Sequence, residues 1–253
     1  MSILKITRET KIVFVAVAII CAISFTVAYL YYGGINKSED PRIVETKLMF
    51  VQYDNYIADK NYIKAASLLD SIEKVFLKVP GYSESYEPGI VYNNRASIYI
   101  SKALYQSTDS LEKHFLLDTA ALHASRCINF YSFWIEHNGS LTKDQVSKLI
   151  QPYFQENDDA FRGKNYKKIR AKRVDDIIQA QKETPRRLSV AYTNLGIIQR
   201  HQYKQKDAIE SYLKAMALWK DNPTALSNLN VLYGKPPQDR SVLRKLFPPD
   251  KNN

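Results

Sequence analysis

The sequence predicts an all-α protein, a helical-repeat solenoid preceded by a single transmembrane helix. Three observations carry this prediction. The tripeptide Asn-Leu-Gly at 194–196 returns 34 residues later as Asn-Leu-Asn at 228–230, and a repeat of that length is typical of stacked helix pairs. An apolar run near the N-terminus is long enough to cross a bilayer. The chain has only 8 Gly, and the roughly 220 residues that follow the run can form one sizeable helical core.

The apolar run extends from Ile12 to Tyr32, 21 residues without a charge or a proline. As a helix it would cross about 30 Å of hydrocarbon. A cleaved signal peptide is the alternative, but such signals have about 7 to 15 apolar residues and a small-residue cleavage site, and no such site precedes Gly33. A lipoprotein signal is disfavoured because Ile20, which is not small, precedes Cys21. We therefore expect a retained signal-anchor helix.

Charges on the two sides of the run predict its orientation. Three cationic residues precede it and three follow it in the flanking windows, so counting alone decides nothing. Lys11 adjoins the run and the free amino terminus adds charge there, which favours a cytoplasmic N-terminus. The sequence thus predicts a cytoplasmic tail at 1–11, a span at 12–32 and a linker at 33–45. The rest would lie outside the cytoplasm, which in a bacterial inner membrane means a periplasmic C-terminal domain.

The repeat is clearest near the C-terminus. Its packing positions are occupied by Tyr192, Leu195, Gly196, Ala208, Tyr212 and Ala215. Gly196 and Ala208 are small where two helices would cross, and the two tyrosines would fill the space around them. These spacings strongly resemble the tetratricopeptide repeat (TPR) family, whose pattern is W-x2-L-G...A-x3-F/Y-x2-A. The resemblance implies an α-solenoid that binds protein partners.

Two earlier segments resemble the repeat more loosely. The first has Tyr56, Tyr62, Ala65 and Leu69 in register, and the second has Tyr92, Asn94, Ala96 and Tyr99, with Ala120, Ala124 and Cys127 as second-helix candidates. Ala96 and Ala120 are 24 residues apart where the repeat needs 12, so we expect an insertion or longer helices from Gln106 to Leu117. The predicted TPR-like domain covers 46–234, with units at about 46–80, 89–137, 189–222 and 223–234 and a basic helical segment at 162–187.

The C-terminal segment, 235–253, is predicted either to cap the solenoid or to extend into solvent as an unpacked tail. Its Val242, Leu243, Leu246 and Phe247 form an apolar patch at helical spacing. Because the end of a solenoid needs a cap, capping is the favoured interpretation.

The TPR resemblance also implies a binding surface. In the family, the first helix of each unit lines a concave groove, where an asparagine commonly hydrogen-bonds the backbone of an extended peptide. Asn94, Asn194 and Asn228 hold that position, although asparagine there also belongs to the structural consensus. The implied groove residues are Asn93, Asn94, Ser97, Thr193, Asn194, Ile197, Arg200, His201, Ser227 and Asn228. Their polar and cationic character favours an acidic or carboxylate-bearing ligand.

Most of the net charge of +10 lies in one segment. Between Arg162 and Arg187 there are ten Lys and Arg against three acidic residues. The segment is predicted as a helix, with Ile169, Val174 and Ile177 or Ile178 as its buried stripe. The predicted basic patch comprises Lys164, Lys167, Lys168, Arg170, Lys172, Arg173, Arg186 and Arg187. It is either a solvated helix face or a site for acidic protein or anionic lipid. Nucleic acid is disfavoured, since an exported domain would not meet it.

The sequence lacks the residue patterns that are typical of catalytic sites. The four histidines lack metal-ligand spacing, and there is no Gly-rich phosphate loop or nucleophile elbow. The acidic cluster at 156–159 lacks the central Gly and distal Glu of a calcium loop, so a turn is the better interpretation. Cys127, on a predicted apolar helix face, is interpreted as a small core residue. We expect no enzyme activity, no cofactor and no metal.

The functional expectation is a membrane-anchored TPR scaffold or adaptor that mediates protein-protein interactions in a cell-envelope complex. Its partners would be other envelope or membrane proteins, bound through an acidic or extended segment. Two alternatives stay open. One is an anchored sensor or receptor for anionic lipid or an acidic peptide, and the other is a cytosol-facing TPR receptor.

Overall fold

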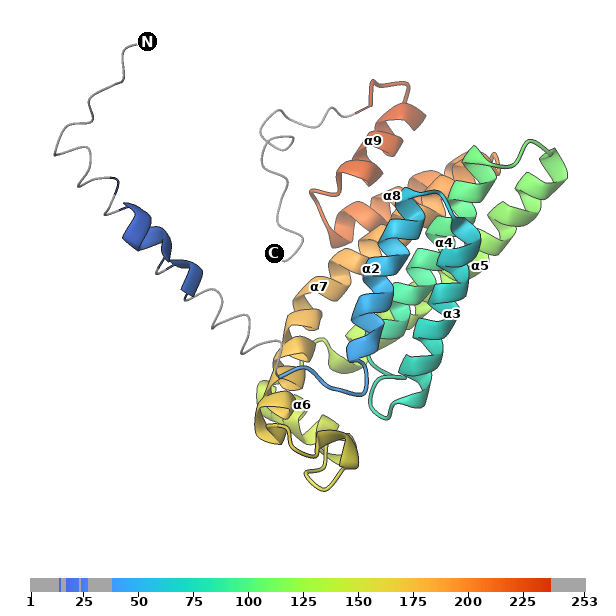
Figure 1. Cartoon of the computed structure of the whole chain (residues 1–253). Coiled ribbons are helices and arrows are strands. Elements are labelled where there is room, and N and C mark those ends of the chain that lie inside the picture. Colours follow the sequence, from blue (N-terminus) through green and yellow to red (C-terminus); the bar gives the residue numbers. More distant parts are fainter. Residues whose placement is uncertain (1–13, 15–16, 23, 27–37, 238–253) are drawn as a thin grey trace, which may run out of the picture.

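The computed structural model of the chain describes residues 14, 17–22, 24–26 and 38–237. Every regular element between residues 38 and 237 is a helix, which confirms the all-α prediction (Figure 1). The α-helices are α2 (Val44–Ala58), α3 (Tyr62–Lys78), α4 (Glu87–Tyr105), α5 (Ser110–Asn138), α6 (Lys143–Ile150), α7 (Tyr166–His201), α8 (Gln205–Leu218) and α9 (Pro223–Leu232). Two short 3-10 helices, η1 (Gln151–Tyr153) and η2 (Asp159–Phe161), lie between α6 and α7.

The predicted membrane anchor falls largely on residues that are not described. Most of Ile12–Tyr32, all of the N-terminal tail and residues 238–253 lie outside the described part. Among the residues that the structure does describe, no helix is long and apolar enough to cross a bilayer. The span, its orientation and the capping role of the C-terminal segment therefore stay predictions.

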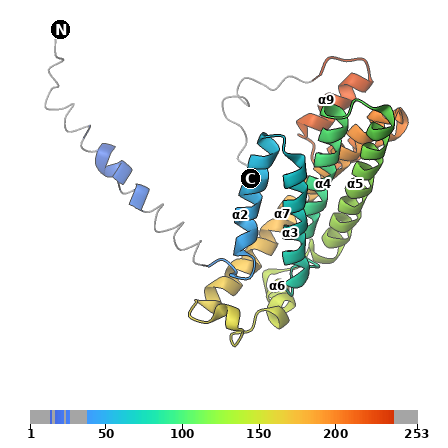
Figure 2. The same ribbon diagram turned by 45° about the vertical axis from the view of Figure 1, so that its right-hand side comes forward.

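The helices form a solenoid-like stack in which most pack against their neighbours in the chain. α2 packs on α3, α3 on α4, α4 on α5 and α8 on α9, while α7 packs on both α5 and α8. Figures 1 and 2 show α9 at the top of the molecule and α6 at the bottom, near the start of α7. The core runs along the whole stack, from aromatic and aliphatic side chains between α2, α3 and α4 to a small cluster between α8 and α9.

The long spacing between Ala96 and Ala120 arises from longer helices rather than from an inserted element. α4 ends at Tyr105 and α5 begins at Ser110, where Asp109 caps the helix by accepting hydrogen bonds from two backbone N–H groups. α5 then continues for 29 residues. Both alanines are fully buried in the cluster between α4 and α5.

One helix spans two of the predicted segments. The segment 162–187 and the unit at 189–222 were expected as separate elements, but α7 runs unbroken for 36 residues and passes through Pro185. A proline inside a helix removes one backbone hydrogen bond and normally favours a break. Here Thr184 and Leu188, on either side, are buried against neighbouring helices, so tertiary packing holds the helix together. The predicted stripe is confirmed, because Ile169, Val174 and Ile177 are buried.

Residues 139–165, which we call the inserted lobe, connect α5 to α7, and α6 packs on α7. α6 begins with a capping box formed by Thr142 and Gln145. Val146, Ile150, Phe154 and Phe161 of the lobe are buried and join the core that α2 and α3 form. The lobe is thus a packed extension of the solenoid at its α6 end.

Two helix crossings depend on glycine. A Cβ atom on Gly196 of α7 would lie 2.5 Å from Cε1 of Tyr212 on α8. A Cβ atom on Gly89 of α4 would lie 2.3 Å from Cε1 of Tyr131 on α5. Both tyrosine rings are buried, so the helices approach closely only because these residues lack a side chain.

Candidate partner-binding face

Helices α2, α4, α9 and the second half of α7 line one side of the stack, which we call the first-helix face. α4 and α7 are joined by a hydrogen bond from Asn194 Nδ2 to Asn93 Oδ1 at 3.0 Å, and a second reaches Ser97 Oγ at 3.3 Å. α7 and α9 are joined by a bond of 3.0 Å from Arg200 Nη1 to Asn228 Oδ1. Groove residues that the sequence assigned to different units therefore lie side by side.

The groove residues are half-buried, with one exception. Thr193 is buried, which contradicts its assignment to the groove. Its hydroxyl accepts a hydrogen bond from Asn222 Nδ2 at 2.9 Å and donates one to the Ser189 carbonyl at 2.8 Å. Asn222 also caps α9 by accepting hydrogen bonds from two backbone N–H groups of that helix. Thr193 therefore serves the docking of α9 and is not available to a ligand.

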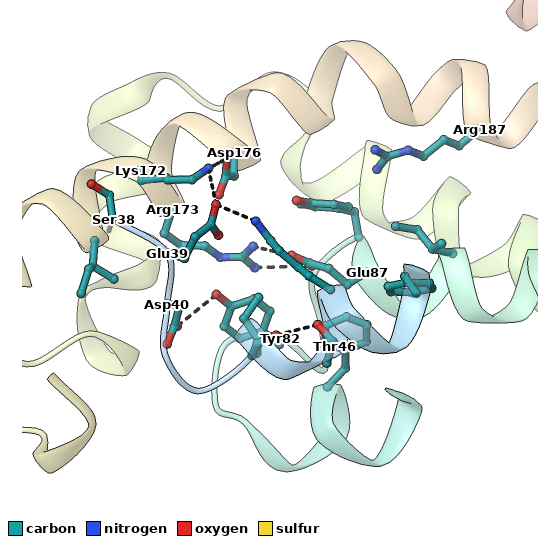
Figure 3. A pocket seen from close by; sticks show the side chains of 17 residues that line it. Ser38, Glu39, Asp40, Thr46, Tyr82, Glu87, Lys172, Arg173, Asp176 and Arg187 are labelled. Carbon is teal, nitrogen blue, oxygen red and sulfur yellow. Dashed lines mark hydrogen bonds and ion pairs between the residues drawn. The ribbon is translucent and has the colours of Figure 1, made fainter. Parts of the chain in front are cut away.

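A hollow of about 260 Å³ opens on the same side, where α2, α4 and α7 come together (Figure 3). Thr46, Lys47 and Phe50 of α2, Glu87 and Ile90 of α4, and Lys172, Arg173, Asp176 and Arg187 of α7 contribute to its lining. Ser38, Glu39 and Asp40, at the start of the described domain, close one edge. The hollow is rich in charge of both signs.

Arg173 holds the centre of this charge network. Its guanidinium pairs with Glu87, donates to Ser85 Oγ at 2.8 Å and lies 4.0 Å from the centre of the Tyr82 ring. Burial alone would lower the pKa of Arg173, but the Glu87 carboxylate raises it above its ordinary value, so the guanidinium stays charged. Arg173 is buried, and the prediction that it belongs to an exposed basic patch is wrong.

Two cations of the hollow have a buried donor without a partner among the described residues, Nε of Arg173 and Nη1 of Arg187, and Arg187 is the more exposed of the two. Its Nη2 pairs with Glu183 at 2.5 Å, and its guanidinium lies 5.1 Å from the centre of the Tyr86 ring. Its Nη1 is buried and has no hydrogen-bond partner within the described part of the chain. Figure 3 shows the guanidinium end of Arg187 directed toward the other labelled side chains. An acceptor in the hollow would satisfy this group once the guanidinium turns toward it.

The other residues of the predicted basic patch separate into two groups. Lys164, Lys167 and Lys168 are exposed at the start of α7. Arg170 donates to Ser147, and Lys172 pairs with Asp176 at 2.8 Å. Arg186 lies over the Trp219 ring at 4.2 Å. The basic segment is therefore not one surface, because a helix turns its residues to different sides.

The nucleophilic and titratable groups outside this face are packing residues. Cys127 is fully buried, as predicted, and its Sγ donates to the Gly89 carbonyl at 3.3 Å. Burial raises the pKa of the Cys127 thiol. His123 stacks on Tyr99 with ring centres 5.5 Å apart. Within the described residues, no group of three or more His, Cys, Asp or Glu could hold a metal ion.

Sequence reasoning missed the residues that pair across the hollow. Glu87 and Arg173 are 86 positions apart, and Asp40 and Tyr82 are 42 apart, so no local pattern links them. The comparisons add no further assignment, because no family model, curated protein or solved structure matches this chain. The geometry of the first-helix face is therefore the best guide to what the protein binds.

Proposed function

We propose that this protein is a membrane-anchored TPR scaffold or adaptor of the cell envelope, and that it binds an extended, acidic segment of a partner protein on the first-helix face. The observation that carries the proposal is the buried, unpartnered Nη1 of Arg187 in a hollow that opens on that face. A buried donor without a partner costs about 1–3 kcal/mol, and a carboxylate bound there would recover that cost.

The hollow and the polar groove residues form a continuous path. Arg187, Asn194 and His201 are seven residues apart along α7, a spacing that places them on one side of a helix. On α4, Ile90 lines the hollow, and Asn93 and Ser97 follow it at intervals of three and four residues. An extended segment could therefore place an acidic side chain in the hollow and its backbone against the asparagines.

Each polar side chain on this path offers a distinct interaction. Arg187 would donate a charge-assisted hydrogen bond to a carboxylate, and Lys47, which is half-exposed at the hollow, would add attraction. Asn93 and Asn194 carry both a donor and an acceptor, so they can pair with any peptide backbone. This combination selects for an acidic side chain at one place and tolerates different sequences elsewhere.

The test begins with the partner. Full-length tagged protein would be purified from detergent-solubilised native membranes, and co-purifying proteins would be identified by mass spectrometry. Arg187→Gln combined with Asn194→Ala should weaken the recovery of a groove partner, because the loss of two hydrogen bonds, one of them charge-assisted, costs roughly 2–4 kcal/mol of affinity.

The matched control is Lys74→Gln combined with Asn129→Ala, on α3 and α5. Both side chains are exposed and lie on helices outside the first-helix face. Their replacement changes charge and size in the same way as the two groove substitutions do. It should leave recovery unchanged. If the Arg187 and Asn194 variant recovers every partner as well as the wild type does, the first-helix face is not the binding surface.

Topology separates this proposal from a cytosol-facing receptor. In the proposed orientation, a C-terminal tag is digested only after the outer compartment is opened, as in spheroplasts, and a tag at the N-terminus stays protected. Digestion of the N-terminal tag in intact cells would instead show the opposite orientation. If the N-terminal sequence of the mature protein begins near Gly33, the apolar run is cleaved off and the protein has no anchor.

A further inference from the structure

The start of the described domain is tied firmly to the inserted lobe. Arg42 pairs with Asp40 at 2.7 Å and donates to the Tyr153 carbonyl of η1 at 2.8 Å. Its guanidinium lies over two lobe rings that stack on each other, 4.4 Å from the centre of Phe154 and 4.8 Å from that of Phe161. The side chain of Arg42 is only 12% exposed. Such stacked, bidentate arginine contacts fix the direction of the backbone that carries them.

The residues just before Arg42 are also held in place, by α7 and the core. Asp40 accepts a hydrogen bond of 3.0 Å from the Tyr82 hydroxyl. Glu39 lies 2.5 Å from Lys47 Nζ and 3.6 Å from Lys172 Nζ. The chain is therefore fixed from residue 39 onward, beside the first half of α7 and the lobe.

The length of chain before these contacts limits how far the lobe can lie from a membrane. The predicted span ends at Tyr32, and five residues separate it from Ser38. A fully extended chain rises at most about 3.3–3.6 Å per residue, so Ser38 lies within roughly 20 Å of the end of the span. The opposite end of α7 is far away, because 36 helical residues extend roughly 54 Å at 1.5 Å each.

The lobe and the first turn of α7, which follows it directly, carry free positive charge at this position. Lys148, Lys164, Lys167 and Lys168 are exposed, and none of them makes an ion pair with another described residue. The acidic residues nearby are largely occupied, since Asp158 contacts Arg42 and Asp159 pairs with Arg162. Glu156 lines the same shallow hollow as Lys164 and Lys167 and offsets one of these charges.

We infer that the inserted lobe is the membrane-facing end of the domain and that Lys164, Lys167 and Lys168 bind anionic lipid headgroups. The inference rests on the proposed membrane anchor. It commits to lipid rather than to an acidic protein, because the short tether holds these lysines close to the bilayer surface whatever else is present. Each lysine near an anionic surface contributes about 1 kcal/mol, roughly a fivefold change in the contact equilibrium.

The test uses the full chain, reconstituted in vesicles of phosphatidylcholine alone or mixed with phosphatidylglycerol. A fluorophore is attached at Asn157→Cys in the lobe or at Gln205→Cys at the far end, in a Cys21→Ala background. Cys127 is fully buried and does not react. A quencher on the lipid headgroup reports how close each fluorophore lies to the bilayer.

The lobe fluorophore should be quenched more than the Gln205 fluorophore, and phosphatidylglycerol should increase this quenching. Lys164→Gln, Lys167→Gln and Lys168→Gln together should abolish the increase, roughly a hundredfold change in the contact equilibrium. The matched control neutralises three exposed lysines away from the lobe, Lys204, Lys206 and Lys220, and should change nothing.

Three results would overturn the inference. Equal quenching at both positions would mean that the lobe does not face the membrane. An increase that survives the loss of the three lysines, or no effect of phosphatidylglycerol, would mean that they do not bind lipid. A chain that fails to float with either kind of vesicle would instead overturn the membrane anchor, which is a failure of the proposed function itself.

Discussion

Replacement of Gly196 by alanine should destabilise the domain, although alanine favours helices. The new Cβ atom would lie 2.5, 2.7 and 2.9 Å from three ring atoms of Tyr212. Carbon atoms in contact are normally about 3.5–4.0 Å apart, so one of the helices or the ring must move by about 1 Å. Tyr212 is fully buried against Ala208 and Ala215, which leaves its ring no free space.

The size of the effect follows from two opposing contributions. Overpacking of a tight core costs roughly 1–3 kcal/mol. Alanine in place of glycine inside a helix recovers about 0.8–1.0 kcal/mol. We therefore expect Gly196→Ala to lower the free energy of unfolding by about 1 kcal/mol, measured by urea unfolding of residues 38–253 with circular dichroism.

A double-mutant cycle isolates the clash. Tyr212→Leu removes the ring edge that the Cβ atom meets, and in that background Gly196→Ala should stabilise the domain, because only its helix preference is left. The expected coupling between the two changes is about 1–3 kcal/mol. If Gly196→Ala stabilises the wild type, or if its effect is the same in both backgrounds, the close approach of α7 and α8 at this point is wrong.

Three other changes test the buried polar and titratable groups. Arg173→Met should cost roughly 3–5 kcal/mol in urea unfolding because it leaves the Glu87 charge buried without its partner, and Glu87→Gln should restore part of that loss. Cys127 should react with a thiol reagent only after unfolding, because burial raises the pKa of the thiol and hides it. Burial and two nearby arginines lower the pKa of His123, so its neutral form is favoured in the folded state. The stability that this provides is fully present above a pH of about 6.5 and is lost as the pH falls, and His123→Gln should flatten that part of a stability-pH curve.

Local patterns were enough to predict the C-terminal helices. Gly196, Ala208 and Tyr212 are spaced as a helix crossing requires, and this spacing is visible in the sequence because each helix pair is short. Local patterns alone could not predict that α7 continues through Pro185, because buried residues on either side of it hold the helix together. The inserted lobe has no repeat pattern, although Thr142 and Gln145 form a capping box that sequence reasoning could have used.

The candidate site was predictable only where its residues share one helix face. Asn194 and Arg200 were assigned to the groove from their positions within a repeat, and both lie on the first-helix face. Arg187 was assigned to a basic patch instead, because charge along the sequence does not reveal which side of a helix a residue occupies. The contact between Arg42 and Phe154 joins residues 112 positions apart, and no sequence pattern predicts such a pair.

The continuity of α7 changes how this array can fold and be divided. In a simple repeat array each unit contacts only its neighbours, so terminal units can unfold alone or be removed. Here one helix belongs both to the lobe end and to the last full unit, where it packs on α6, α5, α8 and α9. Unfolding of either end exposes apolar surface on a helix that the other end needs. The domain should therefore unfold as one cooperative unit. If the chain is cut anywhere within residues 166–201, neither of the two fragments should fold.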